Sequence, residues 1–384
     1  MIRSLIFLFW LGSTIGATAA DTVRVCAYNL LKFSQDNEDG RIPQFARILD
    51  SIRPDIVVCS EVADATAGPR FVSEVMKWGS FAATPYYDGP DTEILVLYHQ
   101  AMFRLIATRR IPTELRDIFE TTLEHVDVNG QPDDTIAVYG VHLKASSSSS
   151  DEQQRAREVA ALTARMTSLE NVIIAGDYNV YRPDEPALLA LTGPAASRQF
   201  VDPLGSNWRR NDASFTSFYT QCTRSSTIAS CGGGVDGGMD DRFDFILTSS
   251  QLAPRVLAST YTAFGNDGSI RFNKSINNPP NQKVSAEIAD ALLCASDHLP
   301  IYVDMVLGDI PASVDDSSNS QWWSCDGRSI TIAPWTPEVG IFTAQGRRIV
   351  SVATSERPSS IADLPPGLYI LQHSSVSVPV VIVR

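Results

Sequence analysis

VIIAGDYN, residues 172–179, is an apolar run that ends in a carboxylate and an amide. Its Val and Ile content and the Gly near its end are typical of a buried β-strand. Asp177 and Asn179 stand two positions apart, so in an extended backbone their side chains point to the same side. Such a pair can position a water or a metal ion while the amide donates a hydrogen bond to the substrate. An Asx turn is the structural alternative.

The same pattern recurs across the chain, with polar residues beside other short apolar runs. Asn29 ends VRVCAYN, Glu61 ends DIVVCSE, His142 follows IAVYGV, Asp244 lies in DRFDFIL, and Asp297 and His298 precede LPIYVDM. Proteins of the α/β class usually place their chemistry at strand ends, so we expect these side chains to gather in one site. Each residue alone has a structural interpretation, as a capped acid or a buried histidine, so the prediction depends on the whole set.

Helical spacing and further apolar runs fill the intervals between these motifs. A helix is predicted over 42–52, and Pro54 marks its end. Its apolar face is Ile42, Phe45, Ile48, Leu49 and Ile52. A second helix follows the serine run 146–150, with Ser150 and Gln153 as a capping box. Further strands are expected at 93–99, 135–143, 241–247 and 299–307, with loops over 100–134 and 191–240.

The first twenty residues, MIRSLIFLFWLGSTIGATAA, have an early Arg, a short apolar core and small residues at their end. This pattern predicts a secretory signal, residues 1–20, cleaved after Ala20. A retained anchor is the alternative, although the apolar core is too short to span a bilayer stably. No later segment reaches about eighteen consecutive apolar residues, so we expect no transmembrane segment in the mature chain.

The chain is acidic. Its 384 residues carry a formal net charge of −13, which becomes −14 when Arg3 leaves with the signal. This charge argues against a protein that holds nucleic acid by electrostatic attraction alone. A nuclease is not excluded, because bound divalent cations can reverse the local sign at the site.

Export permits disulfides, and the six Cys residues allow up to three. Cys222 and Cys231 flank a short polar segment and are the preferred pair, and Cys294 with Cys325 is a second, weaker pair. Cys26 and Cys59 lie inside apolar runs, so we expect buried free thiols there.

Composition changes near Gly308. Residues 308–328 form a polar linker, and residues 329–384 hold short alternating apolar segments separated by turn residues. The second pattern predicts a small all-β module. It has no cluster of acids and histidines, so we expect the chemistry within residues 21–307.

Carboxylate, amide and imidazole groups, without a catalytic Ser or Cys motif, indicate metal-assisted hydrolysis of a phosphate ester. Glu61 is the first candidate ligand for Mg²⁺, because a carboxylate at the end of an apolar strand is costly without a cation or partner. A capped structural acid is the alternative. His298 is the candidate general base, with Asp244 as the partner that fixes its tautomer, and Asp297 can reach a metal.

Other residues are candidates to contact the phosphate group. His142 is the first of them, with Glu93 as an orienting carboxylate. Lys144 in HLKAS lies next to His142 in the sequence and can complement a phosphate. Arg116 and Arg242 are further candidates, with surface salt bridges as their structural alternative.

The ordered motifs CAYNLL, VCSEV, VHLKAS, AGDYN, DRFDFIL and SDHLP resemble those of the endonuclease/exonuclease/phosphatase superfamily. The resemblance covers about residues 22–307 and implies a four-layer α/β sandwich with a divalent metal site at one edge. It implies that Asn29, Glu61 and Asp297 belong to the metal site. It further implies that His142, Asp177, Asn179, Asp244 and His298 are catalytic, with Asp177 and His298 as the acid/base pair.

The tail resembles a second known family. IFTAQGRRIVS, IADLPPGLYILQ and the closing VVIVR are similar to the C-terminal sorting domain of the type IX secretion system of Bacteroidetes-type bacteria. This resemblance implies export across the outer membrane by that machinery, with the protein released or attached at the cell surface.

These features together predict a secreted phosphodiesterase that uses Mg²⁺, with Mn²⁺ or Ca²⁺ as alternatives, and that acts as a monomer. The first interpretation is a nuclease that hydrolyses extracellular DNA or RNA. A phosphatase or phosphodiesterase acting on a small or lipid head-group phosphate ester is the alternative with the same chemistry. An inactive surface binding or adhesion protein is the alternative of another class. We expect the loops 100–134, 191–240 and 262–295 to determine the substrate, and they contain no motif that identifies it.

Overall fold

The computed structural model describes the main part of the chain and separate strands of the tail. The described residues are 21–34, 40–308, 323–325, 330–332, 339–343, 348–352, 359–361, 364, 367–373 and 376–382. The predicted signal, residues 1–20, and most of the predicted linker lie outside them. Among the described residues, no helix is long and apolar enough to cross a membrane.

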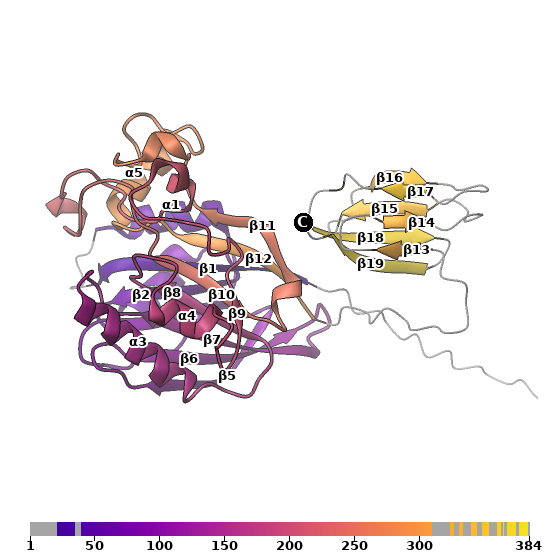
Figure 1. The fold of residues 1–384 in the computed structure, drawn as a ribbon, viewed down its shortest axis with the longest axis horizontal. Helices are drawn as coiled ribbons and strands as arrows, with labels where there is room; N and C mark the ends of the chain where they lie inside the picture. Colours follow the sequence, from indigo (N-terminus) through magenta and orange to yellow (C-terminus); the bar gives the residue numbers. More distant parts are fainter. Residues whose placement is uncertain are drawn as a thin grey trace, which may run out of the picture.

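Two six-stranded mixed sheets form the centre of the main domain (Figure 1). In spatial order the first contains β11 (Val256–Ala263), β12 (Ile301–Leu307), β1 (Asp21–Phe33), β2 (Ile56–Val62), β4 (Glu93–His99) and β3 (Phe81–Ala83). The second contains β5 (Phe103–Ile111), β6 (Ile118–Val126), β7 (Pro132–His142), β8 (Val172–Asp177), β10 (Asp244–Ser249) and β9 (Phe200–Val201). The pairs β1–β2 and β7–β8 are parallel, and the other neighbours are antiparallel.

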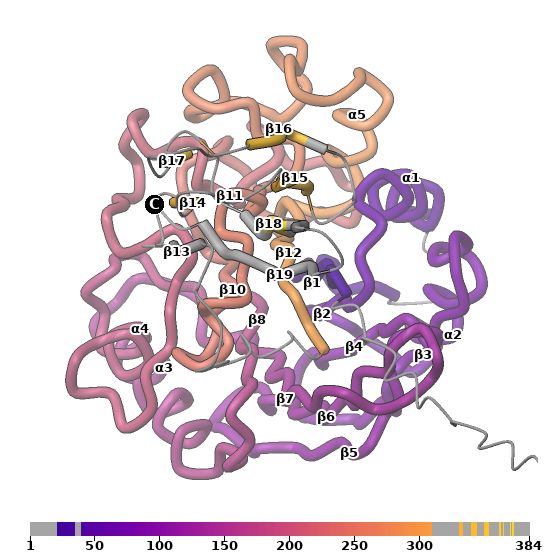
Figure 2. Tube along the Cα trace, turned by 90° about the vertical axis from the view of Figure 1, so that its right-hand side faces the viewer, coloured from indigo at the N-terminus to yellow at the C-terminus, as the bar shows by residue number. Residues whose placement is uncertain are grey.

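Helices cover the outer faces of both sheets. They are α1 (Ile42–Ile52), α2 (Ala67–Arg70), α3 (Ser149–Thr163), α4 (Pro186–Thr192) and α5 (Ala286–Ala295). Short 3₁₀ or π helices occur at Phe71–Val75, Ala213–Phe218, Ala229–Cys231, Ala253–Arg255 and Ser269–Arg271. Figure 1 shows α1 and α5 beyond the first sheet and α3 beyond the second, and Figure 2 places α1 and α3 on opposite sides. The predicted four-layer α/β sandwich is confirmed.

Strand β8 is buried on both of its faces. Ile173 and Ala175 belong to the core between the sheets, whereas Val172 and Ile174 belong to the core under α3 and α4. Both faces of β8 are therefore buried, which explains its unbroken apolar run. In the adjacent strand β7, a Cβ on Gly140 would lie 2.2 Å from the Ile94 side chain, so glycine is needed where the sheets approach each other.

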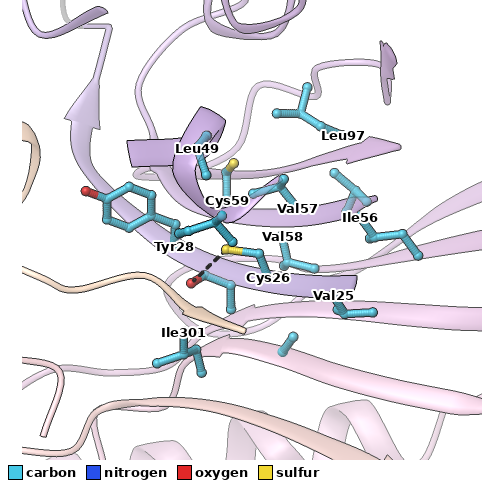
Figure 3. Close-up of a cluster of buried hydrophobic side chains, with 14 of the residues drawn as sticks. Val25, Cys26, Tyr28, Leu49, Ile56, Val57, Val58, Cys59, Leu97 and Ile301 are labelled. Carbon is cyan, nitrogen blue, oxygen red and sulfur yellow. Dashed lines mark hydrogen bonds between the residues drawn. The ribbon is translucent and has the colours of Figure 1, made fainter. Parts of the chain in front are cut away.

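The core beneath α1 is apolar and contains two thiols (Figure 3). Helix α1 buries the predicted face Ile42, Phe45, Ile48, Leu49 and Ile52. Cys26 and Cys59 are fully buried and free, as predicted. Burial raises the pKa of both thiols, so they stay protonated and behave as small apolar groups.

The disulfide differs from the predicted pairs. Cys231 is bonded to Cys294, with their Cα atoms 4.7 Å apart, and Cys222 is a buried free thiol. Both predicted pairs, Cys222–Cys231 and Cys294–Cys325, are therefore wrong. The fold brings the end of α5 against the short turn Ala229–Cys231, and closeness in sequence gave no sign of this contact.

Several elements inside the expected loops also differ from the prediction. Strands β5 and β6 lie within 100–134, β9 lies within 191–240, and α5 lies within 262–295, where β11 also ends. Helix α3 begins two residues early, because Ser148 and Asp151 form the capping box in place of Ser150 and Gln153.

The tail folds as a small all-β module, as predicted. One sheet contains β13 (Trp323–Cys325), β14 (Ile330–Ile332) and β17 (Ser359–Ile361), and the other contains β16 (Arg348–Val352), β15 (Val339–Thr343), β18 (Gly367–His373) and β19 (Val376–Ile382). Its own apolar core includes Ile330, Val339, Ile341 and Leu371. The exact domain boundaries stay predictions.

Candidate active site

The strand register places three predicted residues side by side at one edge of the second sheet. His142, the last residue of β7, is level with Asp177, the last residue of β8. Asp244, the first residue of β10, is level with Asp177 on its other side. Because β7 and β8 are parallel and β10 runs the opposite way, two strand ends and one strand start meet here.

The first sheet contributes Asn29 from β1 and Glu61 from β2. Asn29 Nδ2 lies 3.0 Å from Glu61 Oε1 and 3.1 Å from Asp177 Oδ2, so one amide donates to a carboxylate of each sheet. Asn29 Oδ1 accepts a hydrogen bond from the Leu31 N–H at 2.9 Å, which fixes the orientation of the amide. Glu61 has a φ of 56°, a left-handed backbone that costs free energy for a side chain of this type.

Asp177 is buried at the centre of these contacts. Its Oδ1 accepts a hydrogen bond from the Asn179 N–H at 2.9 Å, so the predicted Asx turn and the predicted polar pair are both present. Burial raises the pKa of Asp177 to about 7, and the negative charges of Asp244 and Glu61 act in the same direction against the opposing effect of His298. The carboxyl group therefore exchanges its proton near neutral pH.

His298 lies just before β12 and is held from both sides. Its Nδ1 lies 2.7 Å from Asp244 Oδ2, which is the predicted partner, and its Nε2 lies 3.8 Å from Asp177 Oδ2. Burial lowers the pKa of His298, but the carboxylates of Asp244 and Asp177 outweigh it and raise the pKa well above its ordinary value. The two carboxylates therefore favour the protonated ring, and the contact with Asp244 fixes the orientation of Nδ1.

His142 has the opposite electrostatic environment. Its Nε2 lies 3.5 Å from Asp177 Oδ2 and 3.8 Å from Glu61 Oε1. Burial lowers its pKa well below the ordinary range, and the positive charges of Arg116 and His298 lower it further, so the ring is neutral. The expected orienting contact from Glu93 is absent, because His142 Nδ1 has no hydrogen-bond partner among the described residues.

Asn179 completes the predicted set beside Asp177. Its φ of 49° is left-handed, which turns the chain sharply after β8. Its Nδ2 donates to the Leu143 carbonyl oxygen at 3.1 Å, directly after His142. The side chain is therefore fixed at the edge where β7 and β8 end.

The residues present fit a divalent cation. Among the described residues, Glu61 and Asp177 form no ion pair with Lys or Arg, although they share one amide donor. Two neighbouring carboxylates without a Lys or Arg partner suit Mg²⁺, which is usually bound through one or two protein carboxylates with waters and a substrate phosphate. In the described part of the chain, no group of three or more His, Cys, Asp and Glu side chains has the arrangement of a metal site.

The other two predicted metal-site residues have different surroundings. The amide nitrogen of Asn29 faces the carboxylates, so in this arrangement Asn29 positions them. Asp297 Oδ2 accepts a hydrogen bond from the Val235 N–H at 2.7 Å, and its buried Oδ1 has no partner among the described residues.

Arg116 is one of the three cations expected to contact phosphate, and its charge lowers the pKa of His142. It donates to the Leu143 carbonyl oxygen at 3.3 Å and to Asp91 Oδ2 at 2.7 Å. Lys144 Nζ lies 3.0 Å from Asp151 Oδ1 at the start of α3. Arg242 does not face the site, which corrects that expectation.

Arg242 is buried within the second core. Its two terminal nitrogens donate to the Asp202 carboxylate at 2.8 and 2.9 Å, and its guanidinium lies 4.1 Å from the Phe245 ring centroid. A phosphate contact and a surface salt bridge were the two expectations for Arg242, but its ion pair is buried and joins it to a residue forty positions away.

One contact in the site was missed by sequence reasoning. The Gln221 side-chain amide lies 2.6 Å from His298 Nε2 and occupies the side of the ring that faces Asp177. Gln221 stands in the long expected loop 191–240, and its residue type and neighbours carry no signal of this role. Only the pairing of its backbone with His298 and Asp241 brings it into the site.

Comparison with known proteins gives a likeness of fold. No family model matches the sequence, and no curated protein matches it. Truncated TDP2 from Caenorhabditis elegans is similar at 19% identity over 74% of this chain and 98% of that chain, with a TM-score of 0.47. The human Nocturnin catalytic domain with bound sulfate is similar at 16% identity over 76% and 98%, with a TM-score of 0.45.

A third similar structure is an endonuclease/exonuclease/phosphatase family protein from Bacteroides thetaiotaomicron, at 14% identity over 76% of this chain and 97% of that chain, with a TM-score of 0.46. That name is the one that the sequence motifs suggested. At these identities and TM-scores the likenesses add nothing to the assignment of function, which therefore depends on the geometry of the site.

Proposed function

We propose that this protein is a divalent-metal-dependent phosphodiesterase, with nucleic acid as its substrate. The observation that carries the proposal is the pairing of Asp177 and His298. A carboxyl group with a pKa raised to about 7 lies 3.8 Å from the ring of His298, whose pKa is also raised and which Asp244 holds in place. Two groups whose surroundings move their pKa values in this way form an acid/base pair suited to neutral pH.

In the proposed reaction Asp177 accepts the proton of the attacking water as that water's oxygen bonds to phosphorus. His298 takes the role of acid in place of the base expected from the sequence, because its raised pKa favours the protonated ring. It donates its Nε2 proton to the leaving oxygen as the bond between that oxygen and phosphorus breaks, and Asp244 stabilises the ring throughout. Neutral His142 and the amide of Asn179 contact the phosphoryl oxygens. A bound divalent cation near Glu61 would neutralise the negative charge of the phosphate group.

Chelation tests this proposal directly. Purified full-length protein with Mg²⁺ or Mn²⁺ is assayed on plasmid DNA, RNA, a chromogenic phosphodiester, sphingomyelin and inositol phosphates. We expect turnover of nucleic acid and of the chromogenic diester, and we expect excess chelator to lower it at least about a hundredfold, since a metal contributes several kcal/mol to the transition state. Added Mg²⁺ should restore it.

The panel also separates the alternatives. Turnover confined to sphingomyelin or inositol phosphates would support the phosphatase or head-group alternative. No turnover of any substrate would support the binding-protein alternative and refute the proposed chemistry. Activity that persists with chelator present would refute the role of the metal.

We further propose that the protein is exported as a monomer and released or attached at the cell surface. The support is the signal-like segment 1–20 and the sorting-like motifs in 330–384. Deleting residues 330–384 should leave the protein inside the outer membrane of a host with the type IX machinery, as fractionation and immunoblotting would show. Equal export with and without the tail would contradict the sorting role.

A further inference from the structure

A planar cation, Arg210, is linked to the catalytic histidine through two aromatic side chains. We propose that Arg210, stacked on Tyr181, is the stacking surface for the nucleobase that adjoins the scissile phosphate. This inference rests on the proposed function and narrows its substrate to nucleic acid whose bases are unpaired. Arg210 and Tyr181 would determine specificity for the base, whereas the residues described above contact only the phosphate group.

The orientation of Arg210 is set by two neighbours. Its guanidinium carbon lies 4.6 Å from the Tyr181 ring centroid. Its Nε lies 2.7 Å from Asp241 Oδ1, and its second terminal nitrogen, Nη2, lies 3.1 Å from Asp241 Oδ2. The side chain nevertheless remains 39% exposed, so part of it is accessible from solvent although Nε is buried.

Tyr181 in turn is fixed at the edge of the active site. It follows Asn179 by two residues, and its backbone N–H donates to Glu185 Oε1 at 2.7 Å. Its ring meets the Phe243 ring edge-on at 4.9 Å, and the Phe243 ring lies 6.4 Å from the ring of His298. The pair is thus joined to the catalytic histidine through one aromatic side chain.

A second connection runs through Asp241. Its backbone pairs with Gln221, whose amide lies 2.6 Å from His298 Nε2. The segments that contain Gln221 and Asp241 therefore position both the stacking surface, Arg210 on Tyr181, and the ring of His298.

The charge balance favours a base over a second phosphate. Asp241 neutralises the guanidinium of Arg210, so the pair attracts an anion weakly but keeps its flat face. Arginine planes and aromatic rings are the usual stacking partners of unpaired bases. Bases inside a duplex are already stacked, and lipid or inositol head groups have no such ring. The chemistry therefore selects single-stranded nucleic acid or a nucleoside phosphate ester.

Two chromogenic diesters with the same leaving group test the inference. Thymidine 5′-(p-nitrophenyl phosphate) carries a base, and methyl p-nitrophenyl phosphate does not. For the unaltered full chain we expect kcat/KM to be at least about tenfold higher for the thymidine ester, in the lower part of the range that base stacking gives. Arg210→Ala should remove most of this preference through KM.

Matched variants separate stacking from charge and from folding. Arg210→Lys keeps the positive charge but lacks the planar guanidinium, so it should lose the preference for the thymidine ester. Tyr181→Ala should lose this preference too, whereas Tyr181→Phe should keep it. The control is Arg182→Ala, because Arg182 is 53% exposed and pairs with Glu152 and Asp184 on the surface. It should leave the preference unchanged.

The outcomes are distinct for the inference and for the proposed function. Equal kcat/KM for both diesters in the unaltered protein overturns the inference and leaves the phosphodiesterase proposal standing. The inference is also overturned if Arg210→Ala lowers kcat/KM for both diesters by the same factor, so that their ratio is preserved. No turnover of either diester refutes the proposed function itself.

Discussion

Replacing Asp177 by Asn lowers kcat/KM on a phosphodiester by about a thousandfold or more, in the upper part of the range for a positioned acid or base. Asn keeps the size of the side chain and can still accept the Asn179 N–H, but it cannot take a proton from water. Steady-state kinetics on the chromogenic diester measures the effect. The exposed Asp184→Asn removes the same charge and serves as the control. Retention of more than a tenth of the turnover by Asp177→Asn would show that another group is the base.

The same carboxyl group should set the acid side of the pH profile. Turnover requires ionised Asp177, so it rises as pH passes through about 7. The positive charge of His298 opposes the increase in the pKa of Asp177. In His298→Ala that opposition is lost, so the residual activity should rise only at higher pH. An unchanged acid side in this variant would contradict the coupling.

Stability should move in the opposite direction to activity. The pKa of Asp177 is raised from its ordinary value of 3.8 to about 7, so its ionised form destabilises the folded state above about pH 7. This cost declines as pH falls below 7 and is absent below the ordinary value. Asp177→Asn should therefore raise the free energy of unfolding at pH 8 by about 1–2 kcal/mol, with little effect near pH 4. Denaturant unfolding at the two pH values tests the sign.

Removing the Cys231–Cys294 disulfide should lower the free energy of unfolding by about 4 kcal/mol. The bond closes a sequence separation of 63 residues, and the loss of chain entropy in the unfolded state grows with the length of that loop. Denaturant unfolding of Cys231→Ser with Cys294→Ser measures the change. The double substitution also removes the covalent bond four residues before Val235, whose backbone N–H donates to Asp297 Oδ2.

Cys222 provides the matched control for that experiment. It is buried and free, and its Sγ donates to the Arg224 carbonyl oxygen at 2.8 Å. Cys222→Ala should cost about 1 kcal/mol, as an ordinary small substitution does. Equal losses in Cys222→Ala and Cys231→Ser would instead support the Cys222–Cys231 pair that sequence spacing suggested.

The central strands and their polar ends could be predicted from sequence because both faces of those strands are buried. VIIA in β8 and IVVC in β2 are unbroken apolar runs, and the polar residues that follow each run lie at the edge of the sheet. Edge strand β5 gives no such signal. In FRLIATRRI, Ile106 is exposed while Ile111 is fully buried, so neither alternation nor an unbroken apolar run appears.

Long-range partners account for the remaining errors. Arg242 is buried because Asp202 neutralises it, and Cys294 pairs with Cys231 because α5 folds back over the loop. Gln221, Arg210 and Asp241 meet His298 and Tyr181 only through loop pairing. Each of these contacts joins segments far apart in the chain, and the residue pattern within a segment does not identify its distant partner.

The single amide of Asn29 makes the site sensitive to shear between the two sheets. It spans the interface, with one hydrogen bond to a carboxylate from each side, and both bonds are about 3 Å long. Sliding one sheet by a fraction of that length would break one bond before it exposed any apolar surface. The close approach at Gly140, two residues before His142, sets that alignment. Substitutions deep between the sheets can therefore impair catalytic precision while the fold itself remains intact.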